Sequence, residues 1–264
     1  MSKSKNLSLL YTPSGRAGEY ANKGYACNLY TGCPHGCKYC YSPATLRMTR
    51  EQFHSCVKPK KNCLERLEVD LAKVGKLDEP IFLCFSCDPY PMGYDCSTTR
   101  AAIRLIKLSG NHVRILTKNG GYAKQDFDLL GSGDEFGVTL TMLARQQYKW
   151  EPLAGTIYSR LSAITTARHL NIKTWVSFEP VIYPDQTLHT IEHLAGCIDV
   201  IKIGKLNYIN ALPANLRAEV EHIDWRQFAI DASQLCERLG INYMLKADLK
   251  AYLKPGDLLE ASDD

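Results

Sequence analysis

Short apolar segments alternate with amphipathic stretches along most of this chain, and that alternation limits the fold to a few architectures. Residues 81–85 are apolar at every position, which is typical of a strand covered on both faces of a parallel sheet. A weaker first strand is predicted at residues 26–30. Further strands of the same kind are predicted at residues 113–117, 136–141, 174–178 and 200–203.

Helical periodicity fills the intervals between these segments. Ile157, Leu161 and Ile164 are spaced four and three residues apart, as on one face of a helix, and a last helix is predicted at 225–239. Strands that alternate with helices form βαβ units, and about six such units fit between residues 26 and 239. The pattern therefore predicts one α/β domain, either a partial barrel or an open sheet, with active residues where the strands end.

Composition narrows the class of protein. The chain has 264 residues, of which 45% are hydrophobic and 23% charged, and this excludes disordered and fibrous proteins. The net charge is +4 and the charges are spread along the sequence, which does not indicate the dense basic face of a strong nucleic-acid binder. No apolar run is long enough to span a membrane and no secretory signal is recognisable, so we expect a cytoplasmic protein.

Eleven cysteines in such a chain indicate a reducing compartment and a use other than disulfides. Cys33, Cys37 and Cys40 lie within eight residues, directly after the first predicted strand, whereas the other eight are scattered and fit small buried core residues. The C-x3-C-x2-C spacing lets three thiolates bind three irons of one [4Fe–4S] cube. The fourth iron is then open to the amino and carboxylate groups of a small ligand.

Two other interpretations of these cysteines are less favourable than a cluster. A structural zinc site normally has four ligands in two separated pairs, and His35, inside the same loop, would close a tetrahedron only with strain. A disulfide with one spare thiol is disfavoured by the reducing compartment. The spacing favours a cluster.

The segment from Gly32 to Tyr41 resembles the cluster-binding loop of the radical S-adenosylmethionine (SAM) superfamily, with the aromatic Tyr39 before the third cysteine. More of the chain is similar to one branch, the spore photoproduct lyase-like proteins, over roughly residues 26–207. The similarity rests on short motifs in a fixed order, which are Cys87-Asp88-Pro89-Tyr90, Thr99-Arg100, Leu116-Thr117-Lys118, Glu151-Pro152, Arg160-Leu161 and Glu179-Pro180-Val181.

This resemblance implies a partial (β/α)6 TIM-like barrel with the cluster at its mouth, and we expect residues 208–264 to form a C-terminal helical extension packed on it. It implies a [4Fe–4S] cluster and SAM as cofactors, and a flavodoxin- or ferredoxin-type electron donor. The implied activity is reductive cleavage of SAM to a 5′-deoxyadenosyl radical that abstracts hydrogen from a substrate. A nucleic acid or a damaged base is the implied substrate, as in photolyase-like DNA repair by a lyase. The alternative is a non-catalytic, metal-stabilised nucleic-acid or protein adaptor.

Candidate catalytic residues follow the second predicted strand, and they are Cys87, Asp88 and Tyr90. The resembling branch uses a cysteine in this region as a hydrogen-atom donor. That position falls on Cys87 or on Ser86, whose O–H bond is a far poorer donor. Asp88 could instead only form a turn before Pro89, and Tyr90 could relay a radical.

Seven residues are candidates for SAM binding, and most stand at predicted strand ends, where side chains reach the barrel mouth. Tyr39 is expected near the adenine by analogy, and Lys118 near the carboxylate as a compact positive charge. A buried charge needs a partner, which predicts a pairing of Arg160 with Glu179. The full set is Tyr39, Asp88, Lys118, Thr139, Thr141, Arg160 and Glu179.

Overall fold

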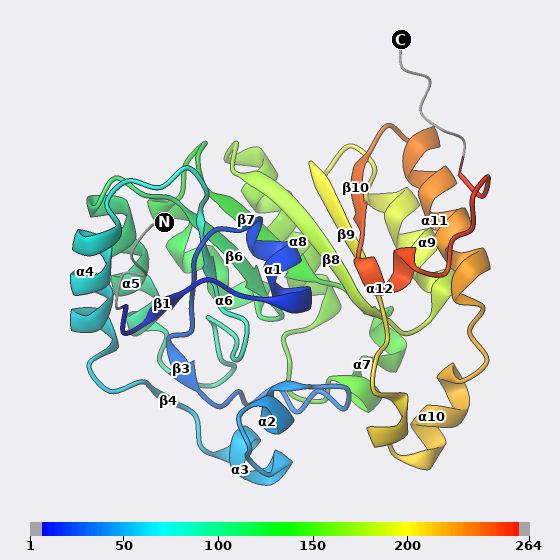
Figure 1. The fold of residues 1–264 in the computed structure, drawn as a ribbon, viewed down its shortest axis with the longest axis horizontal. Helices are drawn as coiled ribbons and strands as arrows, with labels where there is room; N and C mark the ends of the chain where they lie inside the picture. Colours follow the sequence, from blue (N-terminus) through cyan, green and yellow to red (C-terminus); the bar gives the residue numbers. More distant parts are fainter. Residues whose placement is uncertain (1–6, 259–264) are drawn as a thin grey trace.

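The computed structural model describes residues 7–258, and its centre is an eight-stranded sheet (Figure 1). In hydrogen-bonded order the strands are β1 (Leu10–Tyr11), β2 (Ala26–Cys27), β5 (Ile81–Leu83), β6 (Val113–Thr117), β7 (Glu135–Thr139), β8 (Lys173–Val181), β9 (Val200–Lys205) and β10 (Asn242–Leu245). Neighbours from β2 to β10 are parallel, whereas β1 is antiparallel to β2. No pairing between described residues joins β10 to β1, so the barrel is partial. The predicted α/β class and parallel sheet are confirmed.

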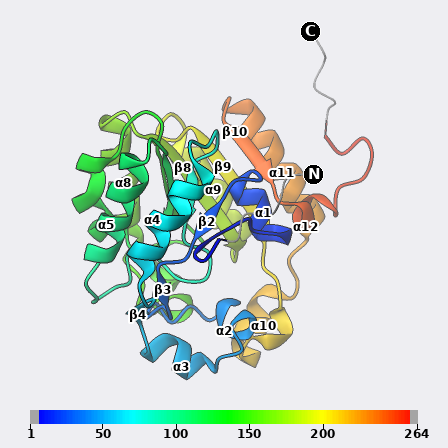
Figure 2. The same ribbon diagram turned by 60° about the vertical axis from the view of Figure 1, so that its left-hand side comes forward.

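Five longer helices cover one face of the sheet (Figures 1 and 2). They are α4 (Cys63–Val74), α5 (Ser97–Leu108), α8 (Ile157–His169), α9 (Pro184–Leu194) and α11 (Trp225–Arg238). Their apolar sides form the main core with the strands, where Ile103 and Ile164 pack in one cluster with Phe136 and Val176. The shorter helices are α1 (Gly15–Ala21), α2 (Ser42–Thr45), α3 (Arg50–Ser55), α6 (Gly120–Ala123), α7 (Ala144–Trp150), α10 (Ala214–Val220), α12 (Ala247–Lys250) and the 3-10 turns η1 (Lys124–Leu129) and η2 (Ile209–Ala211).

A smaller aromatic core lies on the other face of the sheet, under α1. Tyr20 of α1 packs against Phe82 of β5 and Trp175 of β8, with ring centroids 6.1 Å and 5.7 Å away. Tyr20 also lines the cavity described below, so this core adjoins the functional site. The carboxyl ends of the strands remain for the functional site.

Local capping signals set the helix ends. Thr156 Oγ1 accepts a hydrogen bond from Ser159 N at 3.1 Å at the start of α8, and Asn171 adopts φ 57° just after its end. Asp224 Oδ1 accepts one from Gln227 N at 3.0 Å at the start of α11. Such bonds satisfy amide groups that have no partner within a helix. Among the described helices, none combines the length and the apolar character needed to cross a membrane.

Two expectations about the elements need correction. The region after residue 207 is not only helical, because Asn242–Leu245 forms β10 and extends the parallel sheet beyond β9. Its side chains are at most half-buried at this sheet edge, so no apolar run marks it in the sequence. The predicted strand at 26–30 is split, since Tyr30–Thr31 forms β3, which pairs with β4 (Lys58–Pro59) in a separate two-stranded sheet.

Candidate active site

A cavity of about 440 Å³ lies at the carboxyl ends of the strands, where active residues were predicted. Its walls come from the cysteine loop after β3, the loops after β5 and β6, the ends of β7 and β8, and the segment after β9. Nine of the twelve predicted site residues line it, which are Cys33, Cys37, Tyr39, Cys40, Cys87, Asp88, Lys118, Thr139 and Glu179, and the alternative donor Ser86 lines it as well. Three predicted site residues do not line it, which are Tyr90, Thr141 and Arg160.

The first half of the cysteine loop is fixed by the end of α3. Cys33 N donates to Phe53 O at 3.1 Å, and His54 Nδ1 lies 2.8 Å from Cys33 O. Gly32 has φ 79°, and a Cβ atom there would lie 2.6 Å from Cys56 O and 2.7 Å from Phe53 O. Only glycine allows this close approach of two backbone segments.

The second half of the loop is held from two sides. Arg50 Nη1 donates to Cys37 O at 3.1 Å, and its Nη2 donates to Cys40 O at 3.0 Å. On the other side, Lys38 N donates to Trp150 O at 2.9 Å. Protein contacts alone therefore fix the backbone that presents the three thiols to the cavity.

The three thiols fit a [4Fe–4S] cluster better than a single metal ion. Between residues 7 and 258, no group of three or more His, Cys, Asp or Glu side chains is arranged to hold one ion. A cube requires no such convergence, because each thiolate binds a different iron. Burial raises the pKa of Cys37 to about 12 and also raises that of Cys33, a cost that the positive charge of bound iron would offset.

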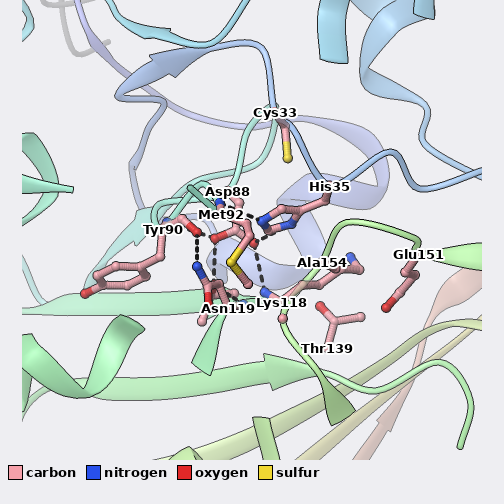
Figure 3. Close-up of polar contacts among 12 residues, drawn as sticks. Cys33, His35, Asp88, Tyr90, Met92, Lys118, Asn119, Thr139, Glu151 and Ala154 are labelled. Atoms are coloured by element: carbon pink, nitrogen blue, oxygen red, sulfur yellow. Dashed lines mark hydrogen bonds and ion pairs between the residues drawn. The ribbon is translucent and has the colours of Figure 1, made fainter. Parts of the chain in front are cut away.

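His35 is part of this loop but is engaged elsewhere (Figure 3). Its Nε2 accepts a hydrogen bond from Met92 N at 3.3 Å, and its Nδ1 lies 3.6 Å from Asp88 Oδ2. Burial lowers the pKa of His35, which favours the neutral ring. The side chain therefore braces two loops, which argues against the zinc interpretation in which it is the fourth ligand.

The carboxylate of Asp88 joins the loops after β5 and β6 (Figure 3). Its Oδ1 accepts from Tyr90 N at 2.8 Å and from Thr117 Oγ1 at 2.6 Å, and its Oδ2 accepts from Lys118 N at 2.8 Å. Tyr90 itself is fully buried and donates its hydroxyl to Asp126 Oδ2 at 3.1 Å, away from the cavity. Asp88 is thus a bracing group at the cavity wall, and its catalytic role stays a prediction.

Lys118 presents an available ammonium group to the cavity. Its Nζ lies 5.6 Å from the centre of the Tyr39 ring, and no hydrogen bond or ion pair of Nζ is formed with any described residue. Burial lowers the pKa of Lys118, but the nearby Cys37 and Glu151 outweigh that effect, so the pKa is raised. The group therefore remains charged at neutral pH and can pair with a ligand carboxylate.

Glu151 is a buried carboxylate that was not among the predicted site residues. It connects three of the predicted SAM-binding residues. Glu151 Oε1 accepts hydrogen bonds from Tyr39 Oη and, at 2.8 Å, from Thr141 Oγ1, while Oε2 accepts from Arg160 Nη2 at 2.5 Å. Glu151, Thr141 and Arg160 are all fully buried. In the sequence, Glu151-Pro152 stands out only as one short motif of the resemblance, and its partners appear only in three dimensions.

The predicted pairing of Arg160 with Glu179 is wrong. Arg160 pairs with Glu151 and also donates from Nη1 to Thr139 O at 2.9 Å, all behind the cavity wall. Glu179 instead lies 3.5 Å from the Nζ atom of Lys246, the residue that follows β10. Arg160 and Glu179 each have a buried partner of opposite charge, as expected. Their positions at strand ends did not determine which residue that partner is.

Comparison with known proteins decides the family. The model of the radical SAM superfamily matches residues 27–198, more than half of the chain. This chain belongs to the radical SAM superfamily. As a radical SAM protein it is an enzyme, and membership implies a [4Fe–4S] cluster and SAM, which the cysteine loop and the adjoining cavity fit.

Solved structures support the same fold. A spore photoproduct lyase complexed with dinucleoside spore photoproduct has a TM-score of 0.65 and 15% identity, with 92% of this chain and 79% of that chain covered. A mutant of that lyase with bound AdoMet and the same ligand has a TM-score of 0.66, with equal identity and coverage. Streptococcus suis SuiB bound to S-adenosylmethionine has a TM-score of 0.57 and 11% identity, over 89% of this chain and 53% of that chain. No curated protein matches the chain.

Proposed function

We propose that this radical SAM enzyme cleaves SAM reductively and uses the product to abstract hydrogen from a substrate bound in the same cavity. One observation carries the proposal: the three cysteines, Tyr39 and Lys118 line a single cavity at the carboxyl ends of the strands. A cluster held by Cys33, Cys37 and Cys40 would, when bound, supply the one electron that reductive cleavage of SAM to methionine and a 5′-deoxyadenosyl radical requires.

The side chains of this enzyme bind and orient the cofactor. The ammonium group of Lys118 would pair with the SAM carboxylate, because it is charged and has no carboxylate partner in the described structure. The ring of Tyr39, fixed through its hydroxyl to Glu151, would contact the adenine. Thr139 and Glu179, which line the cavity, would accept hydrogen bonds from the ribose hydroxyl groups.

Cys87 is the proposed hydrogen-atom donor to the substrate radical. It lines the cavity and is 8% exposed, so its S–H bond faces the enclosed space rather than bulk water. Ser86 lines the same wall, but an O–H bond is too strong to donate a hydrogen atom to a carbon radical efficiently.

The proposed substrate class is a damaged pyrimidine in a nucleic acid, in the manner of a lyase. Support comes from the fold shared with a spore photoproduct lyase that binds a dinucleoside photoproduct. The open part of the cavity also offers aromatic surface, including Phe85 and Tyr208, the latter 67% exposed. Such rings can stack on bases.

Two further features belong to the proposal. A flavodoxin- or ferredoxin-type carrier would deliver the one electron that each cleavage of SAM consumes. The enzyme would work in the cytoplasm, in keeping with its cysteines, all eleven of which are free.

Anaerobic incubation with SAM and dithionite tests the proposal. The reconstituted enzyme should contain iron and release 5′-deoxyadenosine, and Cys33→Ala, Cys37→Ala or Cys40→Ala should abolish both, whereas Cys197→Ala should retain both. Iron-containing protein that releases no 5′-deoxyadenosine would favour the adaptor function. Added dinucleoside spore photoproduct tests the substrate: conversion to thymidine residues, lost in Cys87→Ala, is the expected result.

A further inference from the structure

Positive charge is concentrated in one short segment, although the sequence as a whole suggested an even spread. Residues 38–61 contain six cations and one acid, a net charge of +5, whereas the whole chain carries +4. The other 240 residues are therefore net −1. We call the six cations the basic face, and they are Lys38, Arg47, Arg50, Lys58, Lys60 and Lys61.

The basic face is exposed and not neutralised. All of its members are exposed except Lys60, which is half-buried. Within residues 7–258 none of the six forms an ion pair, whereas cations elsewhere are often paired, as Arg100 is with Asp128 and Arg168 is with Asp199. Uncompensated charge of one sign on one surface attracts an oppositely charged partner.

The basic face belongs to elements that lie side by side. α2, α3 and β4 stand together beyond the carboxyl ends of the sheet in both views (Figures 1 and 2). They form the outer side of the cysteine loop. Arg50 connects the basic face directly to the cysteine loop, because it donates to the carbonyl groups of Cys37 and Cys40.

Apolar surface adjoins two members of the basic face, Lys38 and Arg50, which line the same groove. Tyr41 and Leu46 are 43% and 40% exposed. A groove of about 530 Å³ beside them is lined by Met48 of the same segment and Leu212 after η2. Cys40 lines both this groove and the cavity on the inner side of the loop, so the groove reaches the cysteine site from outside.

We infer that the basic face and this groove are the docking surface for an acidic electron-carrier protein. The inference rests on the proposed function, which needs one electron per SAM cleaved. The carrier would lose that electron, and the cluster held by Cys33, Cys37 and Cys40 would gain it. An apolar centre with a charged rim is typical of a protein interface. A partner seated here is separated from the cysteine site by only the loop itself.

A nucleic acid is the competing occupant. Its phosphate backbone would use the same cations, but it would gain little from the apolar centre formed by Tyr41, Leu46 and Met48. The proposed substrate also has its own place in the inner cavity, which shares Tyr208 with the groove but extends to the strand ends at Thr139 and Glu179. These two points favour the protein carrier.

Binding of a flavodoxin tests the inference. We propose to measure its dissociation constant for the cluster-loaded enzyme by calorimetry at low and high salt. The variant Arg47→Glu/Lys58→Glu/Lys61→Glu should bind at least about tenfold more weakly at low salt and lose most of the salt dependence. The matched control Lys76→Glu/Arg104→Glu/Lys250→Glu changes the net charge equally at exposed sites on other elements, and should weaken binding less than about twofold.

The outcomes separate this inference from the proposed function. Dithionite needs no docking, so dithionite-driven 5′-deoxyadenosine release should persist in the charge-reversal variant while flavodoxin-driven release falls. Equal flavodoxin binding by the variant and the control would overturn the inference. Loss of binding to an oligonucleotide, with flavodoxin binding intact, would assign the face to nucleic acid instead. Failure of dithionite-driven release in the unmodified enzyme would count against the proposed function alone.

Discussion

The guanidinium of Arg160 donates to the carboxylate of Glu151 at 2.5 Å, and both side chains are completely buried. Glu151 also accepts the hydroxyl group of Tyr39, the residue before the third cysteine. A single buried ion pair thus connects the cysteine loop to the strand ends of the barrel. Its position makes it the most informative target for substitution behind the active site.

Glu151→Gln should destabilise the protein by about 3–5 kcal/mol. The substitution keeps the shape of the side chain but leaves the charge of Arg160 buried without a counter-charge. Chemical denaturation measures the loss. Glu219→Gln is the control, because it removes the carboxylate of a partly exposed pair with Lys149 and should cost less than about 1 kcal/mol. Equal losses in the two variants would contradict the prediction.

The same carboxylate predicts a pH dependence of stability. Burial would raise the pKa of Glu151, but Arg160, Lys118 and the Tyr39 hydroxyl outweigh it and lower that pKa from 4.5 to about 2. A depressed pKa stabilises the fold above the pKa of the unfolded chain, and the stabilisation is lost as pH falls. The difference in unfolding free energy between the unmodified protein and Glu151→Gln should therefore shrink from pH 4.5 toward pH 2. A difference independent of pH in that range would refute this assignment.

Lys118→Ala should weaken SAM binding about tenfold while leaving the iron content unchanged. The ammonium group faces the cavity beside the Tyr39 ring and forms no hydrogen bond or ion pair in the part of the chain that the structure describes. Equilibrium binding of SAM to the iron-loaded protein measures the effect. Lys124→Ala is the control, since Lys124 Nζ donates to Ser162 Oγ at 2.7 Å outside the cavity. Unchanged affinity in Lys118→Ala would remove this residue from the site.

Gly32→Ala should prevent normal iron loading. Its Cβ would lie 2.6 Å from Cys56 O, so the cysteine loop must move away from α3. Gly93→Ala separates the clash from the backbone conformation, because Gly93 has φ 78° and no heavy atom within 4 Å of a Cβ. Both variants carry the cost of a positive φ, about 1 kcal/mol, but only Gly32→Ala should lose iron. Iron analysis and thermal unfolding distinguish the two.

The sequence predicted the parallel sheet well because strands covered on both faces are continuous apolar runs. Residues 113–117 match β6 in full. The same rule misses an edge strand such as β10, whose side chains are at most half-buried. It also misses β1 (Leu10–Tyr11), which is only two residues long.

The candidate site divides along similar lines. Spacing alone predicts Cys33, Cys37 and Cys40 as cluster ligands, because one short loop contains all three. Strand-end positions correctly brought Lys118 and Thr139 to the cavity. They could not determine ion-pair partners, which depend on the relative placement of separate loops. The sequence therefore did not predict the role of Glu151. It did not predict the basic face either, because the net charge of the whole chain conceals a local excess of positive charge.

Asp88 accepts a hydrogen bond within its own loop, from Tyr90 N, and another from Lys118 N in the loop after β6. The two loops are consequently one mechanical unit. A ligand that draws Lys118 inward would shift the neighbouring Cys87 wall in step with it. Binding of a ligand at Lys118 would in this way also move the Cys87 thiol, which lines the same cavity.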